Sequence, residues 1–405
     1  MNTISLYSKA LVGGLVTALR MVAVLPSLHA AMSLPLRLLS TVCLAFIMIG
    51  VGKEFQFNRG AGRSQAGDYG VAMLAAAVPW LLVALWAYAT DLSVTLPADG
   101  HIPAWVAVLF VARFSAPTSA GVLFSMLHAA GLEKEWMYQK ARVLAIFDDV
   151  DTILLLIPLQ MLILGPRWQL GFILVATVGL LVFGWKYYRR INLPSGPFWL
   201  MAYAVLLTVG LEALAAGTAY LDSSLPVHVE VLLPAFVLGM IMRLDQPQRA
   251  SASKLPFWVS LVFLALVGPA LPTAALALNL ADLPTYLGHA TAFLVLGNLG
   301  KMAPAFFYRK EAKLNERLSL SVGMWPRGEV GAGVLAVAVS LGIGGQMVTI
   351  AALSLALNLA LTGHFIGMAR WLLRPTPLAF KPPDWAYRWR MPVIVAFFTV
   401  VLVAC

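Results

Sequence analysis

Apolar runs long enough to cross a bilayer follow one another along almost the whole chain, separated by short polar segments. A helix needs about 20 apolar residues to span a membrane. The pattern predicts thirteen spans, at 8–29, 36–55, 69–90, 102–128, 141–164, 168–186, 196–220, 226–242, 257–279, 284–308, 317–343, 346–372 and 391–405. The longest predicted connection, 371–390, is too short for a soluble domain. We therefore expect an all-α polytopic membrane protein.

Composition and charge support this fold class. Only 11% of the residues are charged and 60% are hydrophobic, whereas a soluble domain carries about 25% charged residues. This excludes a soluble enzyme, a disordered chain and a disulfide scaffold. The net charge is +10, and the basic residues gather in alternate loops, at 53–63, 134–142, 186–190, 309–317 and 370–390. Positively charged loops stay in the cytoplasm, so the positions of these loops predict a cytoplasmic N-terminus. The excess of positive charge therefore reflects membrane orientation and does not indicate a nucleic-acid partner.

Charged residues inside the predicted spans are the candidates for function. A charge at membrane depth costs about 2.5–3.5 kcal/mol, so such residues usually mark an ion or proton path. Apart from charged residues near the span ends, nine lie within the spans: Arg20, Arg113, Asp148, Asp149, Asp151, Glu212, Lys301, Arg327 and Glu329.

Three of these acids lie on the span at 141–164, which contains AIFDDVDTILLL. At 100° per residue, Asp148 and Asp151 lie near one face and Asp149 is a quarter-turn away. Two adjacent carboxylates in a low-dielectric site cannot both ionise cheaply, so the pair predicts a site that holds protons. Ionised, the same oxygens are ligands for a small cation. The alternative is that these acids pair with basic residues to hold helices together.

Prolines interrupt two other spans. Pro117 lies at 102–128, next to Thr118 and Ser119, and Pro326 and Gly328 lie at 317–343. An interrupted helix is tolerated in a bilayer where its backbone lines a cavity or is buried in protein. The alternative is an ordinary proline kink.

Charged residues flank both predicted interruptions. Arg113 ends one half-helix and Glu329 begins another, where each complements the helix dipole. Arg327 either pairs with Glu329 or faces the opposite interruption, and Arg113 has Asp151 as a further possible partner. In the span at 284–308, Lys301 is expected to pair with Asp149, unless it snorkels to the interface.

The spans also suggest an internal symmetry. The five spans from 8–29 to 141–164 match the five from 226–242 to 346–372, and the two units begin on opposite sides of the membrane. Inverted repeats with paired interrupted helices and a midplane ion site are typical of secondary transporters.

The motifs AIFDDVDTILLL and GMWPRGEVG, with Lys301 between them, resemble the monovalent cation:proton antiporter-2 family, particularly its bacterial sodium/proton antiporters. The resemblance implies that Asp149 is the essential ion- and proton-binding acid, that Asp148 is its neighbour and that Lys301 is its lysine partner. Thr118 and Ser119 match the unwound segment that contacts the transported Na⁺. No cofactor is implied beyond the transported Na⁺ and H⁺.

The resemblance also implies a domain organisation. Residues 1–375 would form the antiporter membrane domain, and 376–405 a cytoplasmic loop and an extra C-terminal helix. The transport core would comprise the three spans from 69–90 to 141–164 and the three from 284–308 to 346–372. The linker would be 168–186. The dimerisation side of a homodimer in the bacterial inner membrane would comprise the spans 8–29, 36–55, 196–220, 226–242 and 257–279.

The function expected from the sequence is electrogenic exchange of Na⁺, and of Li⁺, for H⁺ by alternating access. Cation and protons would compete for the buried aspartates. Two alternatives stay open, K⁺/H⁺ exchange and a non-transporting cation or pH sensor. An intramembrane aspartyl protease is disfavoured because it needs two aspartates on different helices.

Overall fold

The structure is a computed structural model, and it describes residues 3–24, 26–55, 62–96, 103–221, 227, 229–243, 254–267 and 282–373. The predicted C-terminal segment 376–405, with its expected helix at 391–405, lies outside the described residues. Arg20 falls in the first helix, but its side chain also lies outside the described part.

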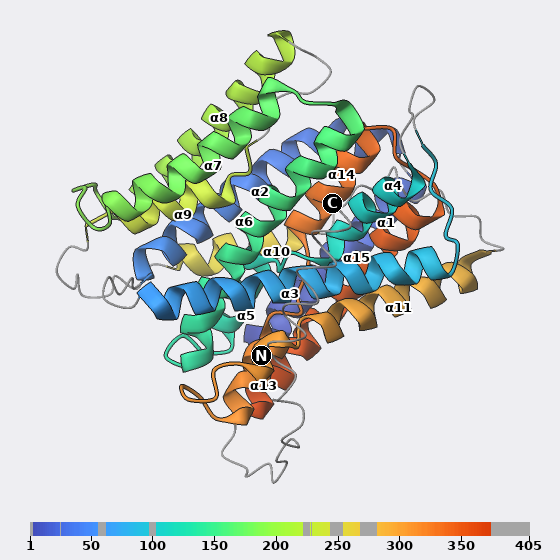
Figure 1. The fold of residues 1–405 in the computed structure, drawn as a ribbon. Coiled ribbons are helices and arrows are strands. Elements are labelled where there is room, and N and C mark those ends of the chain that lie inside the picture. The colour runs from blue at the N-terminus through green and yellow to red at the C-terminus, as the bar shows by residue number, and fades with distance from the viewer. Residues whose placement is uncertain are drawn as a thin grey trace.

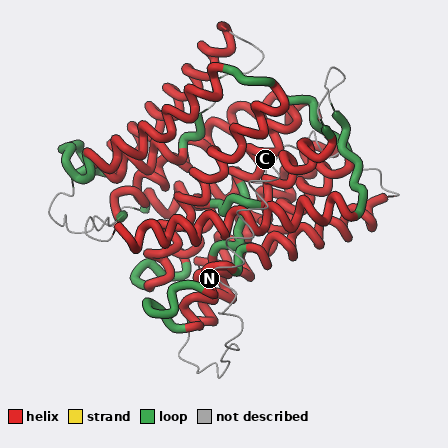
Figure 2. Tube along the Cα trace, viewed as in Figure 1, coloured by secondary structure: helices red, strands yellow, loops and turns green. Residues whose placement is uncertain are grey.

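The described residues are helical almost throughout, as the apolar pattern predicts, and two isolated β-bridges are their only extended pairing. Figure 2 shows the long helices, with short loops inside the bundle at several places. The helices are α1 (Thr3–Val24), α2 (Pro26–Glu54), α3 (Gly62–Ala89), α4 (Ala104–Ala112), η1 (Arg113–Ser115), α5 (Ala120–Ala129), α6 (Trp136–Leu164), α7 (Trp168–Lys186), α8 (Pro197–Leu221), α9 (Leu232–Ile241), α10 (Leu255–Val267), α11 (Leu283–Gly300), α12 (Ala303–Phe306), α13 (Leu314–Gly323), α14 (Glu329–Ser340) and α15 (Gln346–Leu372).

The helices pack in two groups. In the first, α2 lies against α8, α9 and α10, and α1 lies against α10. In the second, α3 packs on α6 and α11, while α15 packs on α11 and α13. Figure 1 shows α3 and α11 side by side, with α7 and α8 along the opposite edge of the molecule. The two groups meet where α1 contacts α15.

Within the described residues, six helical stretches are long and apolar enough to cross a membrane: Leu34–Glu54, Gly67–Ala89, Ala104–Ala129, Trp168–Lys186, Pro197–Leu221 and Gln346–Leu372. Helix α6 has the length but carries three aspartates. The protein is therefore a multi-pass membrane protein, while the predicted count of thirteen spans stays a prediction.

Two of the predicted spans, 226–242 and 284–308, differ from the helices in the structure. Helix α2 extends from Pro26, and its apolar stretch Leu34–Glu54 agrees with the span predicted at 36–55. In the span predicted at 226–242, α9 is helical, whereas the described residues 227 and 229–231 before it are not. The span predicted at 284–308 is divided, because α11 ends at Gly300 and α12 begins with Pro304 in its first turn.

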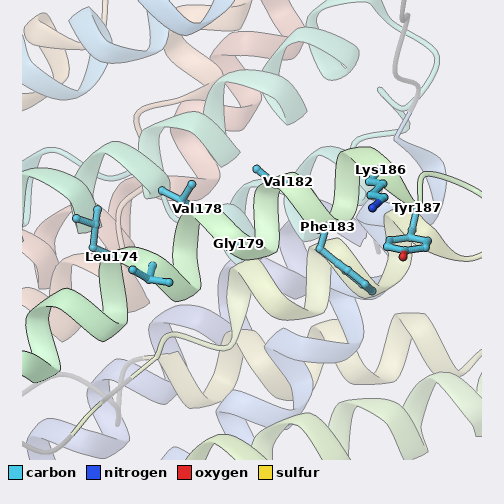
Figure 3. Close-up of a pocket in the computed structure, with 8 residues that line it drawn as sticks. Leu174, Val178, Gly179, Val182, Phe183, Lys186 and Tyr187 are labelled. Carbon is cyan, nitrogen blue, oxygen red and sulfur yellow. The ribbon is translucent and has the colours of Figure 1, made fainter.

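The outer side of α7 and α8 is apolar. Figure 3 shows a groove along α7 lined by Leu174, Val178, Val182 and Phe183, with Lys186 and Tyr187 at one end. On α8, exposed apolar side chains include Phe198, Trp199, Leu206 and Val209. Exposed apolar surface of this kind suits contact with lipid tails. The groove is formed by a different helix from those that carry the buried charges.

Candidate functional site

Both interruptions predicted from the prolines are present, and both are buried. The first separates η1 from α5 over residues 116–119, and the second separates α13 from α14 over 324–328. Pro117 and Pro326 carry no backbone N–H, so neither can donate the hydrogen bond of a continuous helix. The Ser119 side chain caps α5 by accepting a hydrogen bond from the Val122 amide at 3.3 Å.

The two interruptions lie against each other. The Thr118 hydroxyl donates to the Met324 carbonyl at 3.1 Å, and the Ser119 amide donates to the Pro326 carbonyl at 2.9 Å. A Cβ at Gly331 would lie 2.7 Å from the Phe114 carbonyl oxygen, so only glycine fits there without displacement. Polar backbone freed by each interruption is therefore satisfied by the other, as burial in a membrane protein requires.

Glu329 joins the second interruption to the first. Its carboxylate accepts hydrogen bonds from the Ser119 hydroxyl and, at 3.2 Å, from the Gly121 amide. It begins α14 and also contacts the first turn of α5, so it complements the positive ends of both helices. Gly328 precedes it, and a Cβ there would lie 3.0 Å from the Ser119 hydroxyl oxygen.

In this structure Arg327 bonds to the segment that precedes the opposite interruption, and no ion pair joins it to Glu329. Its Nε donates to the Ser115 carbonyl at 2.7 Å and its Nη1 donates to Asn298 Oδ1 at 2.6 Å. Its backbone amide donates to Asn358 Oδ1 at 2.7 Å. The arginine therefore ties η1, α11 and α15 together from inside the second interruption.

Asp148 lies where these segments meet α6 and α11. Its Oδ2 accepts hydrogen bonds from the Thr118 amide at 2.8 Å and from Lys301 Nζ at 2.5 Å. Both side chains of this ion pair are completely buried. Lys301 follows the last residue of α11, where its positive charge interacts favourably with the negative end of the helix dipole.

The expected pairing of Lys301 with Asp149 is wrong in this structure, because the lysine bonds to Asp148. The two aspartates are about 100° apart around α6, so they present different faces. Lys301 does not snorkel either, since none of its surface is exposed.

Asp149 is also buried, with 5% of its surface exposed, and neither carboxylate oxygen has a hydrogen-bond partner among the described residues. Asp148 Oδ1 has none there either. Buried carboxylate oxygens without donors carry a large desolvation cost unless they hold a proton or a cation. The aspartate pair therefore suits reversible binding of either.

The structure does not join Arg113 to Asp151 by a hydrogen bond. The Asp151 carboxylate accepts instead from the Tyr69 hydroxyl at 2.8 Å. The Arg113 guanidinium lies over the Trp80 ring, with Cζ 4.8 Å from the ring centroid.

The sequence model of a family described as "Sodium/hydrogen exchanger, transmembrane" matches residues 10–372. The chain belongs to the sodium/hydrogen exchanger family. A search of the curated proteins finds no matching relative. Membership of this transporter family shows that the chain is a membrane cation/proton antiporter, which agrees with the apolar helices.

Several residues of this exchanger site were missed by the sequence analysis. Asn298 and Asn358 hold Arg327, and Tyr69 bonds to Asp151. The two asparagines had a signal, since polar amides within apolar helices often bond across helices. Tyr69 and Trp80 had none, because aromatic residues on an apolar helix usually pack in the core.

Proposed function

We propose that this exchanger is a bacterial sodium/proton antiporter of the antiporter-2 type, in which Asp149 binds the transported cation and proton in turn. The observation that carries the proposal is the buried Asp148–Lys301 ion pair beside an aspartate without hydrogen-bond donors. One carboxylate is neutralised by the lysine, which leaves the other to be neutralised by Na⁺ or H⁺.

The proposed cycle is a competition for oxygen atoms. Asp149, Asp148 Oδ1 and the hydroxyls of Thr118 and Ser119 would surround Na⁺, with carbonyls of the first interruption. Protons on the aspartates remove the negative charge that Na⁺ needs, so the two ions exclude each other. Na⁺ bound at Oδ1 of Asp148 repels the ammonium of Lys301 at Oδ2, and in this proposal Lys301 then releases Asp148. A proton lost from Lys301 at that step would make the exchange electrogenic.

The two packed groups of helices suit alternating access. In this proposal α3, α6, α11, α13 and α15, with the two interruptions, form the moving core. Helices α1, α2, α8, α9 and α10 form the dimerisation side of a homodimer, and α7 links the two. The N-terminus lies in the cytoplasm and the interrupted halves form inverted repeats.

Exchange in proteoliposomes tests the function. A trapped pH dye should report proton movement on addition of Na⁺ or Li⁺, faster at alkaline pH because protons then compete less. Clamping the membrane potential with valinomycin and K⁺ should accelerate exchange if it is electrogenic. Proton movement driven by K⁺ but not by Na⁺ would establish the potassium alternative. No movement with any of the three cations would overturn the proposal.

A further inference from the structure

Arg113 is buried in a way that leaves its charge without a hydrogen-bonding partner. None of its surface is exposed, and Nε, Nη1 and Nη2 have no hydrogen bond among the described residues. The guanidinium stacks on Trp80, whose Nε1 donates to the Leu109 carbonyl at 2.7 Å. Stacking fixes the position of the cation but does not neutralise it, and a guanidinium stays protonated in proteins. Arg113 is therefore a permanent positive charge within the core.

Asp151, when ionised, carries the charge opposite to that of Arg113. Helix α3, which contains Trp80, also contacts Asp151. Asp151 is 2% exposed, its Oδ1 accepts from the Tyr69 hydroxyl, and its Oδ2 has no partner among the described residues. Tyr69 is in turn fixed edge-on to Phe147 of α6, with ring centroids 5.4 Å apart. Trp80 and Tyr69 both belong to α3, so this helix positions the arginine through one ring and the aspartate through the other.

Both charges act on the exchange site. Asp151 lies about one helical turn after Asp148 on α6. Arg113 begins η1, which leads to Thr118, and the Thr118 amide donates to Asp148 at 2.8 Å. Helix α3 packs against η1 and α6, so the three elements hold these charges in one region. Charge interactions reach further in this low-dielectric surrounding than in water.

We propose that Arg113 and Asp151 are positioning residues that set the cation affinity of the Asp148–Asp149 site in opposite directions. Arg113 repels a cation bound to the aspartates and weakens its binding, whereas Asp151 attracts the cation and strengthens its binding. Together they add no net charge to the core. This inference rests on the proposed function.

The test is a charge-neutralisation cycle in proteoliposomes, with the apparent KM for Na⁺ measured at alkaline pH, where protons compete least. Arg113→Gln should lower KM and Asp151→Asn should raise it, each by roughly tenfold if a unit charge at about 10 Å acts through an effective dielectric constant of about 20. The double variant R113Q/D151N should return KM to near the wild-type value. The maximal rate should change much less than KM.

Matched variants separate charge from structure. Arg113→Lys keeps the charge and should keep KM near wild type, while Arg113→Met repeats the neutralisation with an apolar chain. Arg37→Gln removes one positive charge from an exposed pair with Glu212, where the N–O distance is 3.3 Å, and should leave KM unchanged.

The possible failures are distinguishable. If the wild-type protein shows no cation-dependent proton movement, the proposed function fails and the cycle has no baseline. If the wild type exchanges but both single variants shift KM in the same direction, the inference alone is overturned. A double variant with lowered rate and unrestored KM would likewise assign the two residues a structural role.

Discussion

Two buried arginines flank the interrupted helices, and they differ in how their charges are satisfied. Arg327 is 2% exposed and donates through Nε and Nη1 to Ser115 and Asn298. Arg113 is fully buried and stacks on Trp80 without a hydrogen bond among the described residues. Both lie next to an interruption, so position alone does not decide the role. Arg327 has hydrogen-bond acceptors and therefore links the helices that carry them. Arg113 has none among the described residues, so it acts through its charge.

The largest expected effect on thermal stability comes from replacing Arg327. Arg327→Gln would leave the buried Ser115 carbonyl without the donor Nε, at about 1–3 kcal/mol for an unsatisfied acceptor. It would also leave Asn298 Oδ1 with the longer hydrogen bond from Asn358 Nδ2, at 3.4 Å. Arg113→Gln breaks no side-chain hydrogen bond among the described residues. It loses the stacking on Trp80, about 2 kcal/mol for a desolvated pair, but it also removes the cost of burying a charge without hydrogen bonds, so its net effect on unfolding should be small. Melting followed by tryptophan fluorescence in detergent should therefore give a much lower Tm for R327Q than for R113Q.

The same melting experiment could also contradict the proposed difference between the two arginines. Equal losses of Tm in the two arginine variants would show that Arg113 also has a structural role. An unchanged Tm in R327Q would show that its hydrogen bonds contribute nothing net to stability.

A smaller effect is expected from separating the two interruptions. Gly331→Ala would place a Cβ 2.7 Å from the Phe114 carbonyl oxygen, and overpacking of this kind costs about 1–3 kcal/mol. We expect a lower Tm and slower exchange. The matched control is Gly288→Ala on α11, where a Cβ meets no atom within 4 Å. Exchange and Tm should be unchanged or slightly improved there.

Exchange at the wild-type rate in Gly331→Ala would count against the close contact of the two interruptions as a requirement for transport. Equal losses in both glycine variants would indicate a general effect of adding a methyl group to these helices.

Much of the fold follows from local signals. Apolar runs located most of the helices, and Pro117 and Pro326 predicted both interruptions, which the structure confirms. Each signal is local, because a missing N–H breaks a helix whatever surrounds it. The rarity of charge in the spans also singled out the residues that now form the candidate site.

The pairing of those residues was less predictable, because it depends on tertiary packing. Lys301 reaches Asp148 from the end of α11, and Gly300 there packs so closely on α3 that a Cβ would lie 2.4 Å from the Pro79 nitrogen. No sequence pattern shows that approach. The stacking of Arg113 on Trp80 depends in the same way on the register between η1 and α3.

The central claim is that Asp149 exchanges Na⁺ for protons next to the buried pair of Asp148 and Lys301. Proton release on addition of Na⁺ to the purified, weakly buffered protein in detergent tests it most directly. The wild-type protein should release protons, and Asp149→Asn should release none while keeping its Tm. Undiminished sodium-dependent proton release from the folded Asp149→Asn variant would contradict the account.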